Sequence, residues 1–155
     1  MNPNCTDNNN EILYDEASEC LEIAMKYQKV KKYTEAERYF TEAIDIFEEL
    51  VIPSHCCEEY WFGLAASYNA LAVMLQDAED VNGAQTYYLC AIDVMEGRVD
   101  ENKLEHVPNL AVCYSFLGLL SENEACFRKA YDYAKLFPNN SLCREVIEMW
   151  SDVFQ

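Results

Sequence analysis

The sequence predicts an all-α fold, an α-solenoid of about seven helices in which three helical hairpins precede a C-terminal capping helix. Four glycines and four prolines in 155 residues are too few for the many tight turns of a β-sandwich or β-barrel. Alanine, leucine, glutamate and methionine, which favour helices, are plentiful. With 51% hydrophobic residues, the chain is apolar enough to bury a core and to avoid disorder.

The third observation in favour of this fold is a residue pattern that occurs three times at identical spacing. Each copy has a large residue and then a small one, followed by core residues at plus 3, plus 12, plus 16 and plus 19 from the small one. The copies are Ile23, Ala24, Tyr27, Ala36, Phe40 and Ala43; Leu71, Ala72, Leu75, Ala84, Tyr88 and Ala91; and Leu110, Ala111, Tyr114, Asn123, Phe127 and Ala130. Small residues let antiparallel helices approach closely, and aromatic residues fill the wedge towards the next hairpin. The pattern therefore predicts three similar hairpins in tandem.

These residues resemble the tetratricopeptide repeat, in which a large–small pair and an aromatic on one helix precede an Ala-x3-Phe-x2-Ala run on its partner. The resemblance covers about 120 residues. Asn123 replaces the usual small residue in the third copy. Ala36, Ala84 and Asn123 are 48 and then 39 residues apart, against about 34 in the common form. This wider spacing is similar to the long-helix class of kinesin light chains and many bacterial arrays, which the stretch 68–72 resembles most.

Apolar residues at helical spacing place the seven helices along the chain. They are expected at about 11–31, 34–50, 57–77, 82–97, 103–119, 121–136 and 141–153. Within the last helix, an apolar stripe should cover the end of the array, because the final repeat otherwise exposes an apolar face. That stripe contains Leu142, Val146, Met149, Trp150 and Phe154.

Prolines mark the boundaries between these elements. Pro53 ends the first hairpin and Pro138 the third, while Pro108 starts or kinks the fifth helix because proline has no amide donor. The expected divisions are a disordered segment at 1–10, repeat-like hairpins at 11–53, 54–99 and 100–138, and the capping helix at 139–155.

The charge of the chain excludes two classes of partner. Its net charge is −17, from 28 acidic and 11 basic residues, and no lysine or arginine occurs from Tyr39 to Gly97. Such a field repels nucleic acids and anionic membranes. One basic cluster, Lys26, Lys29, Lys31 and Lys32, is interpreted as the usual basic last turn of a helix.

The cysteines indicate a reducing, cytoplasmic location. The sequence has eight, and five of them occur inside helical apolar patterns without the spacing of a disulfide framework: Cys20, Cys90, Cys113, Cys126 and Cys143. All eight thiols are therefore expected to be reduced. The polar N-terminus lacks the apolar core of a signal peptide, and no apolar run of about 18 residues suggests a membrane span.

Candidate catalytic and metal-binding residues are few. His55 and His106 are the only histidines, and no phosphate loop, nucleophile elbow or metalloprotease motif is present. The cluster of His55, Cys56, Cys57, Glu58 and Glu59 has zinc-ligand chemistry, but adjacent cysteines cannot easily face one tetrahedral ion. The two glutamates instead suit the positive N-terminal end of the third helix. We expect no enzyme activity, no cofactor and no metal.

The resemblance implies that the first helices of the hairpins line a concave groove for a protein or peptide. The corresponding residues are Leu21, Met25, Gln28, Asn69, Val73, Gln76, Val112, Ser115 and Phe116. Apolar side chains mixed with amides suit an extended or helical peptide, although the lysines and arginines of a carboxylate clamp are missing there. Val73, Val112 and Phe116 have an alternative role as residues buried by repeat stacking.

The sequence therefore favours a protein-interaction module that serves as a scaffold or adaptor. If Phe116 belongs to the core, the acidic surface with Glu42, Asp45, Glu48 and Glu49 becomes the candidate site for a basic partner. Two alternatives remain: a small acidic chaperone for one client, and a piece of a longer solenoid, which would expose an apolar face at Trp150 and Phe154. Neither the partner's identity nor the oligomeric state follows from the sequence.

Overall fold

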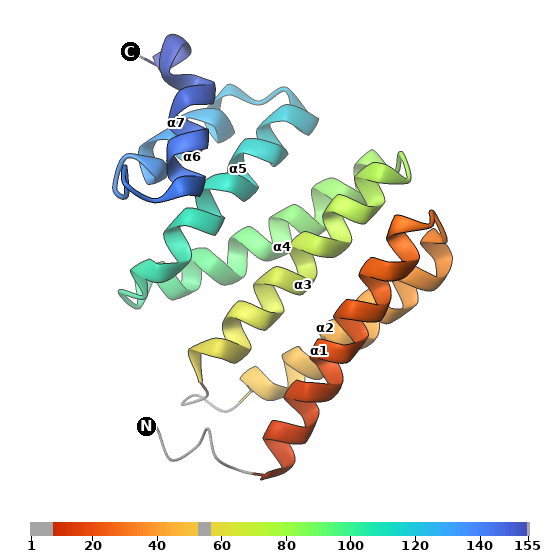
Figure 1. The fold of residues 1–155 in the computed structure, drawn as a ribbon. Helices are drawn as coiled ribbons and strands as arrows, with labels where there is room; N and C mark the ends of the chain where they lie inside the picture. The colour runs from red at the N-terminus through yellow and green to blue at the C-terminus, as the bar shows by residue number, and fades with distance from the viewer. Residues whose placement is uncertain (1–7, 53–56, 155) are drawn as a thin grey trace. The chain divides into compact units, whose positions relative to one another are not determined.

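The fold is given by a computed structural model that describes residues 8–52 and 57–154. The described part is all-helical, as predicted. Its elements are α1 (Asn8–Lys29), α2 (Tyr33–Val51), α3 (Glu58–Asp77), α4 (Val81–Asp100), the 3₁₀ turn η2 (Leu104–His106), α5 (Val107–Ser121), α6 (Glu124–Ala134) and α7 (Ser141–Phe154) (Figure 1). None of the described helices combines the length and apolar character needed to cross a bilayer.

Most helix boundaries agree with the sequence prediction, and the differences have local causes. Residues 8–10, expected to be disordered, form the start of α1, where Glu11 suits the positive helix end. Residues 1–7 lie outside the described part. Pro108 stands at the first turn of α5, where its missing amide donor is not needed.

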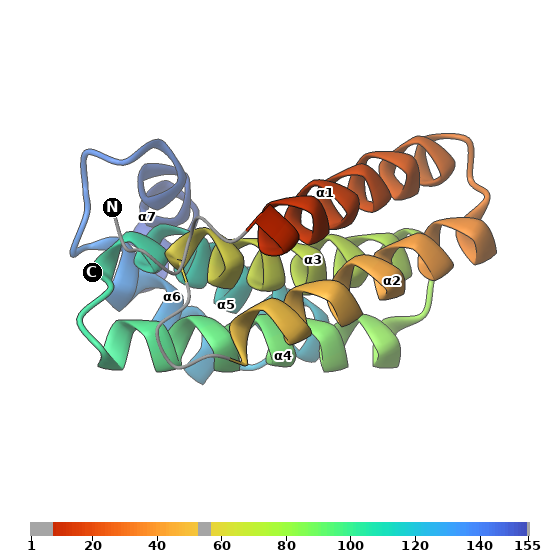
Figure 2. The same ribbon diagram turned by 90° about the horizontal axis from the view of Figure 1, so that it is seen from below.

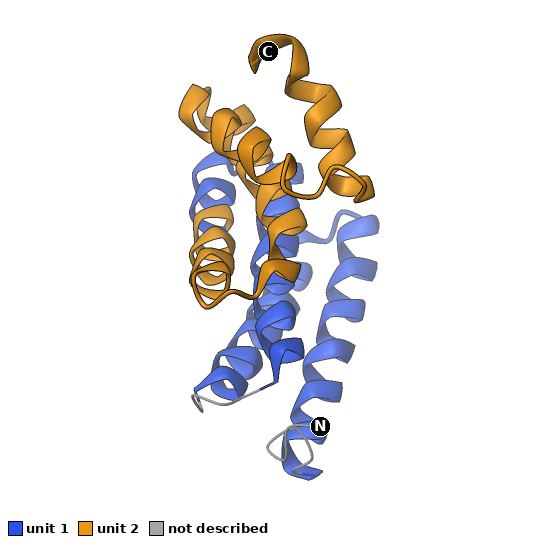
Figure 3. Cartoon of the chain, turned by 90° about the vertical axis from the view of Figure 1, so that its left-hand side faces the viewer, with its two compact units in different colours: residues 1–87 blue, residues 88–155 orange. Residues whose placement is uncertain are grey.

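The chain divides into two compact units, residues 1–87 and 88–155, and α4 runs from one into the other (Figure 3). The three-hairpin division predicted from the sequence does not coincide with this boundary and stays a prediction. Each unit is described separately below.

Unit 1 contains α1, α2 and α3, which all pack against one another (Figures 1 and 2). The first copy of the residue pattern forms its core, because Ala24, Ala36, Phe40 and Ala43 are fully buried. Phe47 of α2 approaches α3 where Gly63 leaves room: a Cβ at Gly63 would lie 2.2 Å from Phe47 Cε1. This glycine therefore sets how closely the two helices approach.

Unit 2 contains α4 from Tyr88 onward, the turn η2, the α5–α6 hairpin and α7, which packs on that hairpin. Trp150 of α7 packs on Phe127 of α6 with ring centroids 4.0 Å apart, and its Nε1 donates to Ser115 Oγ at 3.0 Å. Phe154 meets the ring of Tyr131 at 5.8 Å and the guanidinium of Arg128 at 4.7 Å. Both rings are thus engaged with α6, and α7 covers the hairpin as the sequence predicts for a capping helix.

Asn123, the irregular residue of the third copy, has a local role. It is the N-cap of α6, with an extended backbone, and its side chain accepts a hydrogen bond from the Ala125 amide at 2.9 Å. Asparagine is favoured there because it satisfies an amide that the helix leaves unpaired. The position lies outside the helix, so it does not need to be small.

Four turns between helices share one backbone conformation. Lys31, Glu79, Asn102 and Glu122 have a positive φ, between 51° and 63°, and each follows the end of a helix. In each turn the next residue donates its amide to a carbonyl five residues earlier, for example Lys32 to Tyr27 at 3.0 Å and Asp80 to Leu75 at 2.8 Å. These are Schellman caps, in which glycine is the usual residue.

The cysteine prediction is confirmed for helical residues and wrong for one other. Cys20, Cys90, Cys113, Cys126 and Cys143 are free thiols, and burial raises the pKa of Cys113 to about 12. Cys57, however, is disulfide-bonded. It precedes α3 and does not belong to a helical apolar stripe, so the argument from helical cores does not apply to it. Cys5 and Cys56 lie outside the described residues.

Candidate interaction surface

In unit 1, six of the predicted groove residues lie on two neighbouring helices. Their spacing of four and then three residues forms one stripe on each helix. The stripes consist of Leu21, Met25 and Gln28 on α1, and Asn69, Val73 and Gln76 on α3, and we call them the α1–α3 face. None of the six is buried: Met25 is 46% exposed, Gln76 is exposed, and the others are half-buried.

A polar contact joins the two helices at one end of this face. Gln28 Nε2 donates to Asp77 Oδ2 at 2.7 Å, which links the last turns of α1 and α3. Beside it lies a shallow depression with a volume of about 560 Å³. We call this depression the basic pocket; it is lined by Met25, Gln28, Lys29, Lys31, Tyr33 and Asp77.

Sequence reasoning missed this pocket as a unit. It identified Met25 and Gln28, and it noted Lys29 and Lys31 only as part of a basic helix end. Tyr33 begins α2 and Asp77 ends α3, so they approach α1 only through the packing of three helices. The cluster of lysines was the available signal.

The other three predicted residues lie on α5, in unit 2. Ser115 is 3% exposed and accepts the hydrogen bond from Trp150, so α7 covers it. Phe116 is half-buried and stacks on the buried ring of Tyr88, with centroids 5.8 Å apart and an interplanar angle of 17°. Val112 is half-buried. These residues remain predictions as partner contacts, and two of them have partners within their own unit.

Two segments of the chain match a known protein family. The tetratricopeptide repeat model matches residues 20–55 and 64–96. Over these two segments, 69 of its 155 residues, the chain is similar to the tetratricopeptide repeat family. The two matched segments contain the first two copies of the residue pattern and all six residues of the α1–α3 face. No curated protein matches the chain.

Tetratricopeptide repeats generally mediate protein–protein interactions, and the family is typically non-enzymatic. Among the described residues, no group of three or more histidine, cysteine, aspartate or glutamate side chains is placed to hold a metal ion. His55 and Cys56, from the zinc candidate weighed above, lie outside the described residues. Glu58 and Glu59 stand in the first turn of α3, as predicted.

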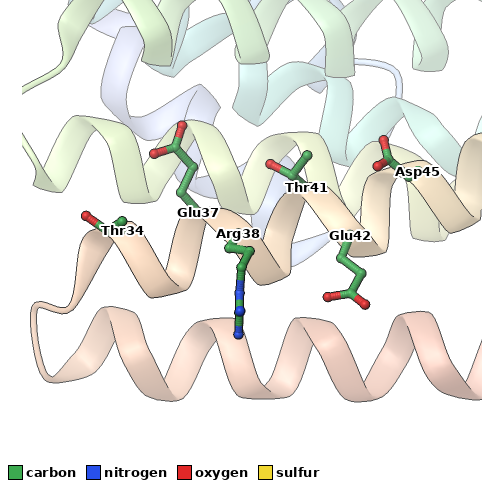
Figure 4. A pocket seen from close by; sticks show the side chains of 6 residues that line it. All are labelled: Thr34, Glu37, Arg38, Thr41, Glu42 and Asp45. Atoms are coloured by element: carbon green, nitrogen blue, oxygen red, sulfur yellow. The ribbon is translucent and has the colours of Figure 1, made fainter.

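The acidic surface lies on α2. A hollow of about 490 Å³ lies along this helix. Figure 4 shows Glu37 and Asp45 of its lining on one side of α2, and Arg38 and Glu42 pointing towards α1. Thr34 and Thr41 complete its lining. Exposed carboxylates in this arrangement can attract a basic side chain, although exposed ion pairs stabilise only weakly.

A polar network in unit 2 is structural. Tyr114 Oη donates to Glu96 Oε1 at 2.5 Å, and Lys129 Nζ lies 3.0 Å from the same hydroxyl and 3.6 Å from the carboxylate. Burial, together with the hydrogen bond to Glu96, raises the pKa of Tyr114. Burial also raises the pKa of Tyr133, which stacks on Tyr114. Protonated phenols beside a paired carboxylate hold helices together and offer no nucleophile.

Replacing Phe116 with alanine should lower the melting temperature of the protein by several degrees. The reason is its stack on Tyr88, because aromatic pairs contribute about 0.5–1.5 kcal/mol beyond the area they bury. Thermal unfolding followed by circular dichroism measures this, with Leu119→Ala as the control, since Leu119 is an exposed apolar residue of the same helix. An unchanged midpoint for Phe116→Ala would contradict a role in the core and favour Phe116 as a partner contact.

Proposed function

We propose that the α1–α3 face of this protein binds an extended or helical segment of a partner protein. The observation that carries the proposal is the accessibility of all six face residues on two adjacent helices of the matched repeats. Apolar side chains such as Met25 and Val73 offer affinity, and the amides of Asn69 and Gln76 can pair with a peptide backbone.

The rest of the proposed role follows from the charge and the cysteines. A net charge of −17 favours a protein partner over nucleic acid or an anionic membrane. Five free thiols support a cytoplasmic location and the disulfide at Cys57 opposes it, so that location stays a prediction. The role as scaffold or adaptor is part of the same proposal.

A random peptide library displayed on phage tests the binding face. We expect selected peptides, resynthesised with a fluorescent label, to bind the Met25→Ala, Val73→Ala double variant about tenfold more weakly than the native chain. The melting temperature should change little, because neither residue is buried. Fluorescence anisotropy measures the affinity and circular dichroism the folding.

The matched control removes two exposed apolar side chains of unit 1 outside the face, Ile12→Ala with Val81→Ala. Its affinity should equal that of the native chain. A loss of the same size in control and face variant would show nonspecific apolar binding and contradict the proposal. Binding that survives the face variant but disappears with Glu42→Gln and Asp45→Asn would move the site to the acidic surface of α2 and identify the partner as basic.

A further inference from the structure

We propose that the basic pocket receives an acidic side chain of the bound segment, beside an apolar side chain that packs on Met25. This inference rests on the proposed function and specifies the chemistry of the partner: a peptide with one or two aspartates or glutamates next to a large apolar residue. The pocket continues the α1–α3 face, since Met25 and Gln28 belong to both.

The first argument is positive charge in the pocket that has no carboxylate partner among the described residues. The chain has 28 acidic residues and 11 basic ones. Lys129 and Lys135 do lie within 4.0 Å of carboxylates, at 3.6 and 3.7 Å. Among the residues that the structure describes, no carboxylate lies within that distance of Lys29 or Lys31. Two lysines that line one depression, neither of them within ion-pair distance of a described carboxylate, are complementary to a carboxylate from outside.

The second argument is the backbone at Lys31. This residue adopts φ 58°, a left-handed conformation that glycine adopts more readily than any other residue. Main-chain hydrogen bonds close this turn, so the turn does not need the side chain of Lys31. The lysine therefore leaves a positive charge at the rim of the pocket. Lys31 is exposed to solvent.

The third argument is the lining, which is suited to a mixed apolar and acidic ligand. Met25 is 46% exposed, and Tyr33 contributes a half-buried ring. Asp77 is the one acid in the lining, and it already accepts the hydrogen bond from Gln28. Its negative charge lowers the affinity for an acidic ligand, which the Asp77→Asn variant below measures.

The short range of electrostatic interactions in salt favours a short peptide over a polyanion as the occupant of the pocket. Charges separated by more than about 8 Å are largely screened at physiological ionic strength, so one or two carboxylates in the pocket interact mainly with the charges that line it, Lys29, Lys31 and Asp77. A nucleic acid would extend past the pocket to the acidic remainder of the chain, which repels it. The occupant is therefore a short acidic segment of a protein.

The test uses the peptides selected from the displayed library, with the full-length protein. We expect aspartate or glutamate next to leucine, methionine or phenylalanine to be enriched. Lys29→Glu with Lys31→Glu should weaken binding about tenfold or more, and raising the salt concentration should weaken the native complex. Asp77→Asn keeps an oxygen acceptor for Gln28 and removes the negative charge, so it should tighten binding about two- to threefold.

Lys135→Glu with Arg144→Glu is the matched control, because it changes the net charge equally at exposed residues of the other unit. It should retain native affinity.

Selected peptides without acids, or affinity that the lysine reversal leaves unchanged, would overturn the inference. The proposed function would survive if Met25 and Val73 were still required. A library that yields no binder at all would count against both. A salt-sensitive dimer in sedimentation, abolished by the lysine reversal, would identify the occupant as a second copy of this chain and overturn the inference as stated.

Discussion

Replacing Phe47 with alanine should lower the free energy of unfolding by about 3–5 kcal/mol, the range for truncating a buried aromatic residue. Phe47 is 1% exposed, meets the ring of Tyr14 edge-on at 5.9 Å and covers the backbone at Gly63. Its removal leaves a cavity where α2 meets both α1 and α3. Urea denaturation followed by circular dichroism measures the loss, with the half-buried Phe137→Ala as a control that should lose less.

A double-mutant cycle isolates the contact between Phe47 and Gly63. Gly63→Ala should destabilise the native chain, because its methyl group would meet the Phe47 ring at 2.2 Å. In the Phe47→Ala background the same substitution should be neutral or stabilising, since alanine favours a helix by about 1 kcal/mol over glycine. Equal effects of Gly63→Ala in both backgrounds would show that the contact is not formed.

Ala43→Leu and Ala91→Leu should each destabilise the protein by about 1–3 kcal/mol or more, because overpacking a closed core forces side chains and backbone to move. Both alanines are fully buried and occupy the same position in successive copies of the pattern. Thermal melting of each variant measures the effect. Ala125→Leu is the control, because that alanine is exposed on α6 and should tolerate leucine.

Unchanged melting midpoints for both alanine variants would contradict the register of the repeats. Destabilisation at Ala43 alone would limit the register to the first hairpin. The two positions lie in different units, so they report on separate cores.

The helices and the core of the pattern could be predicted because their cause is local. Alanines at fixed offsets indicate where helices approach, and Ala24, Ala36, Ala72, Ala84 and Ala111 are all fully buried. The fit of Phe47 to Gly63 could not be predicted in this way. Gly63 is not part of the repeated pattern, and nothing in its neighbourhood in the sequence indicates which ring will cover it.

The candidate surface was only partly predictable for a related reason. Helical spacing identified Met25 and Gln28, but the pocket also needs Tyr33 and Asp77, which three-helix packing supplies. Ser115 was expected on an open face, yet the position of α7 decides its exposure, and spacing along α5 carries no information about α7. Cys57 shows the opposite problem, because an argument valid for helical cysteines was extended to a residue outside the helices.

The turns between helices bear on how relatives of this chain can diverge. Lys31, Glu79, Asn102 and Glu122 keep exposed side chains at left-handed positions, while main-chain hydrogen bonds close each turn. A single codon change at any of them can therefore reverse, remove or add a charge without shifting the helices on either side. Substitutions at these four residues can therefore change the chemistry of the turns while the helical framework is conserved.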